Sequence, residues 1–161
     1  MGLDMYLNKR KFVKSYKANK GEGLINADKI TITTDVHYAN GTKDTSVDTV
    51  NNPSSSVMID IPYCYWRKVN CVHKWFLDAT NQEEDVCQEI EVSGELLMDL
   101  VDRCKRVLDD HTLASTLLPT QEGFFFGSTE YDEYYFDDLK DTLTQLKDVD
   151  PKEYYVYHAS W

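Results

Sequence analysis

The stretch that decides the fold is residues 85–110, DVCQEIEVSGELLMDLVDRCKRVLDD. Its first part, Asp85–Val92, alternates apolar and polar residues, which is typical of a half-buried β-strand. Ser93 then offers a helix N-cap, and Glu95–Asp110 takes up a helical period. The apolar side of this helix consists of Leu97, Leu100, Val101, Cys104, Val107 and Leu108. A strand that leads directly into an amphipathic helix predicts that both kinds of element share one core.

The residues before this stretch predict another strand and another helix. Val57–Ile61 is short and rich in residues that favour strands. From Tyr63 to Ala79 the apolar residues recur every three or four positions, which is the helical period. We therefore expect a helix over 63–79 whose core side includes Trp66 and Phe76.

Downstream, the sequence predicts a connector, a strand, a helix and a closing strand. Leu113–Gln121 is the connector, and Gly123–Gly127, GFFFG, is an apolar run that predicts a buried strand. Thr129 with Asp132 three residues later resembles a capping box at the start of a helix. The core side of that helix is formed by Tyr135, Leu139, Leu143 and Leu146. Glu153–His158 is rich in Tyr and Val, so we expect it to close the sheet.

The first third of the chain predicts a strand and a hairpin. Leu3–Val13 alternates apolar and polar residues, and 29–38 is rich in Ile and Thr. Asn40-Gly41 is a strong two-residue hairpin signal, and 51–56, NNPSSS, is typical of a loop. We interpret 21–56 as a variable hairpin and loop inserted into a single domain over 1–161. The predicted fold class is α+β, with a mixed or antiparallel sheet covered by about three helices.

Charge is distributed unevenly along the chain. The 161 residues carry a net charge of −11, yet residues 1–82 hold 11 Lys/Arg against 8 Asp/Glu, while 83–150 hold 5 against 19. Phosphates are bound by Lys and Arg, so direct binding of nucleic acid through the acidic half is not expected. The sequence has no signal-peptide pattern and no apolar run near the roughly 20 residues of a membrane span. We therefore expect a soluble cytoplasmic protein with no membrane partner.

The cysteines and the acidic clusters do not have the spacing of a metal site. The chain lacks a CxxC pair and an EF-hand pattern. We therefore expect no metal and no cofactor, and we expect the cysteines to be reduced and buried. The four cysteines are Cys64, Cys71, Cys87 and Cys104.

Several segments together resemble a family of small bacteriophage and prophage proteins. They are the opening MGLDMYL, the motif YWRKVNCVHKWF at 65–76, the motif GFFFGSTEYDEYY at 123–135, and the final ASW at 159–161. The resemblance spans most of the chain and is weakest over 21–56. It implies a phage accessory protein that acts in the cytoplasm of a bacterial host cell, and it implies no particular reaction.

Carboxylates along the two C-terminal helices provide the first functional hypothesis. Rows spaced by one or two turns present negative charge to a basic partner. We expect a binder that inhibits or modulates a host protein handling nucleic acid or defence, for example as an anti-CRISPR. Ordinary solubilising surface is the competing interpretation. The expected partner-binding residues are Asp132, Glu133, Asp137, Asp138 and Asp141, with Glu130 beside them and Asp99, Asp102, Asp109 and Asp110 on the other helix.

The second hypothesis is a small enzyme or nucleotide-binding protein. On a helix over 63–79, polar and cationic side chains would share neighbouring faces and could hold a carboxylate or phosphate near the GFFFGST segment. The alternative is that the cations pair with acidic helices, and that the histidine is buried with its hydrogen bonds satisfied. The sequence has no GxSxG, HExxH or P-loop motif, which favours a protein that is not an enzyme. The residues of this second site are Trp66, Arg67, Asn70, His73, Lys74, Ser128 and Thr129.

Overall fold

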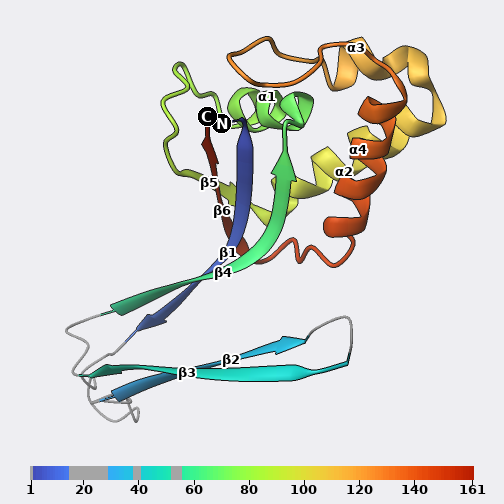
Figure 1. Cartoon of the computed structure of the whole chain (residues 1–161). Helices are drawn as coiled ribbons and strands as arrows, with labels where there is room; N and C mark the ends of the chain where they lie inside the picture. The colour runs from blue at the N-terminus through green and yellow to red at the C-terminus, as the bar shows by residue number, and fades with distance from the viewer. Residues whose placement is uncertain (1, 15–28, 38–40, 52–55) are drawn as a thin grey trace. The chain divides into compact units, whose positions relative to one another are not determined.

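The computed structural model describes residues 2–14, 29–37, 41–51 and 56–161 (Figure 1). The chain divides into two compact units. Residues Phe12–Ile59 form one unit, and Met1–Lys11 together with Asp60–Trp161 form the other. The second unit combines an antiparallel sheet with helices, so the predicted α+β class is confirmed.

The sheet has four strands in the order β4-β1-β6-β5. The central strands β1 (Asp4–Lys14) and β6 (Tyr154–Ser160) pair antiparallel from Asp4↔Ser160 to Arg10↔Tyr154. The outer strands are β4 (Ser56–Arg67) and β5 (Ile90–Ser93), and β5 pairs antiparallel with β6. Strand residues alternate between two faces, so one face can be apolar and the other polar. The buried face includes Met5, Leu7, Tyr155, Tyr157 and Ala159.

Helices cover the apolar face of the sheet. They are α1 (Asn70–Ala79), α2 (Gly94–Asp109), the 3-10 turn η1 (His111–Leu113), α3 (Ala114–Leu117) and α4 (Glu133–Gln145), and Figure 1 shows them gathered beside the strands. The predicted N-cap of α2 is confirmed, because the Ser93 hydroxyl accepts a hydrogen bond from the Leu96 amide at 3.1 Å. Leu97, Leu100, Cys104 and Val107 are fully buried, as the helical period predicts. Within the described ranges, no helix has the length and apolar character of a membrane span.

The helix predicted over 63–79 is wrong in its first part. Strand β4 continues to Arg67, and α1 begins only at Asn70. The alternation of buried Cys64 and Trp66 with exposed Tyr65 is the period of a strand. Helical spacing and strand alternation overlap in this segment, and pairing of β4 with β1 decides between them.

The strand predicted over Asp85–Val92 is also shorter than expected. Only Ile90–Ser93 pairs with β6, while Val86 is 66% exposed and Cys87 has a left-handed φ of 58°. The side chain of Gln88 accepts a hydrogen bond from the Val86 amide at 2.8 Å. A side chain within the same segment therefore satisfies the Val86 amide in place of a strand partner.

The strand predicted at GFFFG is wrong. The segment forms a turn in which the Phe126 amide donates to the Gly123 carbonyl at 3.3 Å. A Cβ at position 123 would lie 2.4 Å from the Phe126 ring, so the turn requires glycine there. Phe126 is buried, but Phe124 and Phe125 are 77% and 45% exposed. Phe125 therefore does not belong to the core that we expected it to join.

The start of α4 differs from the predicted capping box. Asp132, not Thr129, is the N-cap, and its carboxylate accepts from the Tyr135 amide at 3.1 Å. The carbonyl of Thr129 instead accepts from the Thr120 hydroxyl at 3.0 Å, which holds residue 129 outside the helix. The predicted core side is confirmed for Tyr135, Leu139 and Leu146, which are buried, and Leu143 is partly buried against the core.

The outer edge of β4 is protected from pairing with another strand. β4 is the terminal strand in the order β4-β1-β6-β5, so one of its edges has no strand beside it in this sheet. Further along, the side chain of Gln145 accepts from the Tyr65 amide and donates to the Tyr65 carbonyl, both at 2.9 Å. An amide side chain thus takes the place of a neighbouring strand.

The unit formed by Phe12–Ile59 contains the predicted hairpin. Strands β2 (Lys29–His37) and β3 (Lys43–Asn51) pair antiparallel from Lys29↔Asn51 to His37↔Lys43. Gly41 has a left-handed φ of 82°, which glycine adopts easily because it has no Cβ. Residues 21–28, Tyr38, Asn40 and 52–55 lie outside the described residues, so the variable insertion over 21–56 stays a prediction.

Candidate functional site

Asn70, the first residue of α1, fastens this helix to the strap, which we define as residues 120–130. Its Nδ2 donates to the carbonyls of Phe126 at 3.1 Å and Ser128 at 2.8 Å. Its Oδ1 accepts from the Gln121 amide at 3.1 Å. The side chain is buried, so these bonds satisfy polar groups that water does not reach. Asn70 and the strap meet, as the second hypothesis expects, but the amide is fully used in holding the strap.

His73 lies inside the core with both ring nitrogens hydrogen-bonded. Nδ1 is 2.6 Å from the Tyr157 hydroxyl, and Nε2 is 2.8 Å from Oδ2 of Asp85. The Phe126 ring packs edge-on against the imidazole. Burial raises the pKa of Tyr157 well above its usual value. His73 is fully buried. It is thus the buried histidine with satisfied hydrogen bonds that the sequence favours, rather than a general base.

Trp66 and Lys74 lie apart from any shared ligand site. Trp66 is in β4, buried, and its indole Nε1 donates to Oγ1 of Thr142 at 3.0 Å. Lys74 pairs with Asp78 along α1 at 3.1 Å. Because Trp66 and Arg67 belong to a strand, the expectation that they share helical faces with Asn70, His73 and Lys74 is wrong.

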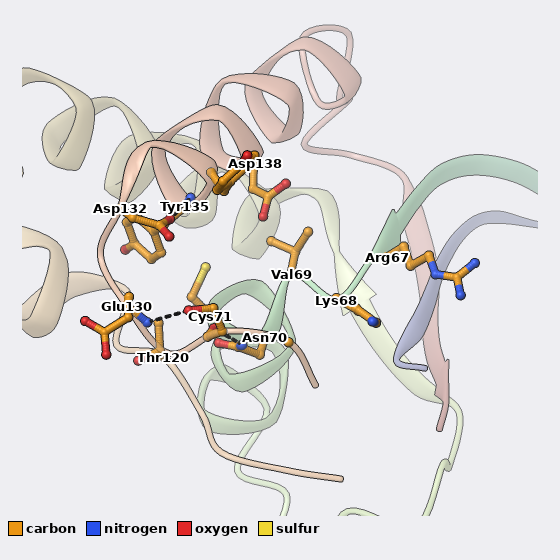
Figure 2. A pocket seen from close by; sticks show the side chains of 13 residues that line it. Arg67, Lys68, Val69, Asn70, Cys71, Thr120, Glu130, Asp132, Tyr135 and Asp138 are labelled. Carbon is orange, nitrogen blue, oxygen red and sulfur yellow. Dashed lines mark hydrogen bonds between the residues drawn. The ribbon is translucent and has the colours of Figure 1, made fainter. Parts of the chain in front are cut away.

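A cleft of about 180 Å³ opens at the start of α1 (Figure 2). Its walls come from the turn between β4 and α1, from the strap and from the first turns of α4. It brings together Arg67, Asn70 and Ser128 from the second hypothesis with Asp132 and Asp138 from the first. The lining residues are Arg67, Lys68, Val69, Asn70, Cys71, Thr120, Gly127, Ser128, Glu130, Asp132, Tyr134, Tyr135 and Asp138.

Left-handed backbone shapes the cleft and the turn beside it. Lys68, Phe125 and Gly127 have φ of 60°, 65° and 95°. A Cβ at Gly127 would lie 3.2 Å from the carbonyl oxygen of Lys68, so the strap approaches the β4–α1 turn closely. The Lys68 amide donates to the Leu3 carbonyl at 2.7 Å, which helps to hold this turn. A left-handed backbone conformation costs roughly 1–3 kcal/mol for a residue with a side chain. Surrounding contacts must therefore hold Lys68 and Phe125 in this conformation.

The cleft has cations on one side and carboxylates on the other. Arg67 and Lys68 are exposed, and neither forms an ion pair with any described residue. In Figure 2 the Arg67 guanidinium extends away from Asp138. Burial raises the pKa of the Asp138 carboxyl to about 6, and the charges of Asp141, Asp137 and Asp132 add to this effect. Asp138 is therefore a half-buried carboxyl whose ionisation is opposed by its surroundings.

The predicted acidic set falls into two groups. Asp132 and Asp138 line the cleft, whereas Glu133, Asp137 and Asp141 are exposed on the outer side of α4. Asp137 pairs with Lys140 at 2.7 Å, and Asp141 accepts from Nε2 of Gln145 at 2.7 Å. We call Glu133, Asp137 and Asp141 the acidic stripe.

Ser128 and Thr129 contribute mainly through the backbone. The Ser128 hydroxyl accepts from the Glu130 amide at 3.1 Å, within the strap itself. Thr129 lines a second, more open hollow of about 580 Å³ rather than the cleft. The hollow is lined by Glu122, Gly123, Phe124, Gly127 and Thr129, so the two depressions adjoin at Gly127.

Three of the four cysteines are buried, as expected, but Cys87 is exposed. It lies in the turn that replaces the first half of the predicted strand. Burial raises the pKa of Cys64 and of Cys104 to about 12, so both thiols stay protonated. Among the described residues, no group of three or more His, Cys, Asp or Glu side chains is arranged to hold a metal ion.

The sequence did not single out Lys68, Asp85, Tyr134 or Tyr157. Lys68 stands next to Arg67, so a search for adjacent cations would have found it. No sequence signal connects Asp85 or Tyr157 with His73, because tertiary packing alone brings them together. No protein family, curated protein or solved structure matches the chain.

Proposed function

We propose that this is a phage accessory protein that acts by binding a basic host protein through the acidic stripe. The observation that carries this proposal is the exposure of Glu133, Asp137 and Asp141 along α4. Their spacing of four residues places them along one side of the helix. Such a row can meet cations on a partner without rearrangement of the fold.

The charge of the whole unit favours the same kind of partner. Residues 1–11 and 60–161 contain 12 Lys/Arg and 23 Asp/Glu, whereas residues 12–59 contain 5 of each. The full excess of negative charge therefore belongs to the unit that carries α4. A concentrated charge speeds the diffusional encounter with an oppositely charged protein.

Helix α2 is a weaker candidate because its carboxylates have cationic neighbours. Asp99 pairs with Arg103 at 2.7 Å and also accepts from the Trp75 indole at 3.1 Å. Asp102 pairs with Arg106 at 3.7 Å. Among the described residues, only Asp137 of the acidic stripe has such a cation, so more of the charge of α4 is available to a partner.

Tyr134 provides an aromatic group beside the acidic stripe. It lies between Glu133 and Tyr135 at the start of α4 and is 80% exposed. Tyrosine is enriched among residues that dominate binding energies, because its ring is large and its hydroxyl can hydrogen-bond. An aromatic anchor next to carboxylates suits a protein partner with a basic, partly apolar surface.

Host proteins that grip DNA or RNA have basic grooves, and an acidic domain can occupy such a groove. With the resemblance to phage and prophage proteins, this supports an inhibitor or modulator of a nucleic-acid-handling or defence protein in the bacterial cytoplasm. An anti-CRISPR is one example of this class.

The test is affinity capture from lysates of infected and uninfected bacteria at about 50 mM and about 500 mM salt, followed by binding measurements with the purified captured protein. Changing Glu133, Asp137 and Asp141 to Lys should weaken binding about tenfold or more. The matched control changes Glu83, Glu84 and Glu91 to Lys, which alters net charge equally outside α2 and α4. Equal affinity for both triple variants would contradict the proposal.

A ligand site in the cleft is the second candidate function, and Asp138 is the observation that favours it. A titratable group with a raised pKa in a cleft marks a candidate for an enzyme or nucleotide site. Thermal unfolding with a panel of nucleotides at about 1 mM should then show a rise in Tm that Arg67→Ala removes. Absence of a shift with every nucleotide would count against this candidate.

A further inference from the structure

Two aromatic rings are displayed beside the cleft. Phe124 is 77% and Phe125 45% exposed, and their ring centroids are 4.1 Å apart. Phe125 is kept in a left-handed conformation with its ring partly in water. Contiguous exposed apolar patches are a feature of interaction surfaces, and this adjacent pair of rings provides apolar area of that kind.

Charged residues of both signs line the cleft and the hollow that adjoins it at Gly127. Arg67, Lys68 and Glu130 all line the cleft, as does Gly127. Glu122 lines the adjoining hollow together with Phe124. All four charged side chains are exposed, and within the described part of the chain none of them forms an ion pair.

We propose that this face, made of Phe124, Phe125, Arg67, Lys68, Glu122 and Glu130, binds the same face of a second copy of the chain. A two-fold axis places each patch against its own counterpart, so the surface must be complementary to itself. The face has the composition that this requires, because it carries two cations, two carboxylates and an aromatic pair. Arg67 and Lys68 of one copy meet Glu122 and Glu130 of the other.

A second copy is favoured over a different partner by the charges. A purely basic partner would leave Arg67 and Lys68 facing like charge, and a purely acidic partner would do the same to Glu122 and Glu130. The acidic stripe lies outside this face. The inference therefore goes beyond the proposed function, and either one can fail without the other.

The test is sedimentation equilibrium of the full chain over about 5–500 μM. The wild-type chain should form dimers within this range. Arg67→Glu with Lys68→Glu, and separately Glu122→Lys with Glu130→Lys, should each weaken dimerisation about tenfold or more. Phe124→Ser should also weaken it. Glu83→Lys with Glu84→Lys is the matched control and should leave the dimer unchanged.

Mixing the two charge-inverted variants provides the sharpest result. One variant then carries only carboxylates on this face and the other only cations, so an equimolar mixture should form a heterodimer although neither variant pairs with itself. Circular dichroism of each variant first establishes that it folds. A wild-type monomer at every concentration overturns the proposal, and so does a dimer that the inversions leave unchanged. Failure of the mixture to associate overturns the assigned pairing.

Discussion

The buried and the exposed polar groups around the start of α1 behave in opposite ways. Asn70 and His73 lie inside the protein and use their side-chain nitrogens and oxygens in hydrogen bonds to the strap, Tyr157 and Asp85. Arg67 and Lys68, only a few residues earlier, are exposed without an ion pair to any described residue. Neighbours in sequence thus divide between side chains that hold the fold and side chains that face solvent, and burial separates them.

Of the changes that test this comparison, Asn70→Ala should reduce the stability of the protein most. It removes three hydrogen bonds and leaves one buried and two partly buried backbone groups of the strap without their partner, which should lower the free energy of unfolding by about 2–4 kcal/mol. Denaturant unfolding measures this change. Lys74→Ala is the matched control on the same helix, because it removes only an exposed pair with Asp78 and should cost about 0.5 kcal/mol or less. Equal losses would mean that burial does not separate the two kinds of residue.

Asp138→Asn should stabilise the protein at pH 7. The folded state raises the pKa of this carboxyl from 3.8 to about 6, so its ionised form is the unfavourable one. Stability should therefore increase as pH falls from above 6 towards 4, and the variant should lose this dependence. The side chain is half exposed, so we expect a gain of about 1 kcal/mol at pH 7. Unfolding measured between pH 4 and 8 tests this, and a loss of stability in Asp138→Asn at pH 7 would refute it.

Reversing the acidic stripe to Lys should leave the fold nearly unchanged. Glu133, Asp137 and Asp141 are exposed, and exposed charges contribute little to stability. The free energy of unfolding should change by less than about 1 kcal/mol. Of the three changes, Glu133→Lys should destabilise the protein most, because a carboxylate in the first turn interacts favourably with the helix dipole. A larger loss of unfolding free energy would show that the acidic stripe stabilises the fold and is not a free binding surface.

Reductant and chelator should have the smallest effect. The buried thiols Cys64, Cys71 and Cys104 are packed in the core, and no described group of side chains is arranged around a metal. The Tm should therefore be the same with and without either reagent. A fall of several degrees with chelator would reveal a metal, and a fall with reductant would reveal a disulfide.

Local signals in the sequence predicted some elements well. Ser93 as N-cap and the apolar side of α2 follow from residues at most four positions apart. The closing strand was predicted over Glu153–His158 and is found over Tyr154–Ser160. For the candidate site, the sequence pointed to Arg67, Asn70 and Ser128, which do line one cleft. It also grouped Asp138 with the outer carboxylates, although Asp138 faces the cleft.

What the sequence determined by itself is the α+β class, the amphipathic helices and the concentration of negative charge, because each depends on composition or on a short period. Only the tertiary structure decided that β4 continues to Arg67, that GFFFG is a turn and that Asp85, His73 and Tyr157 meet. These features depend on partners far along the chain, such as the Leu3 carbonyl that binds the Lys68 amide and the Asn70 side chain that holds the strap. Periodicity reports which side of an element is apolar, but hydrogen bonds between distant segments decide where the element ends.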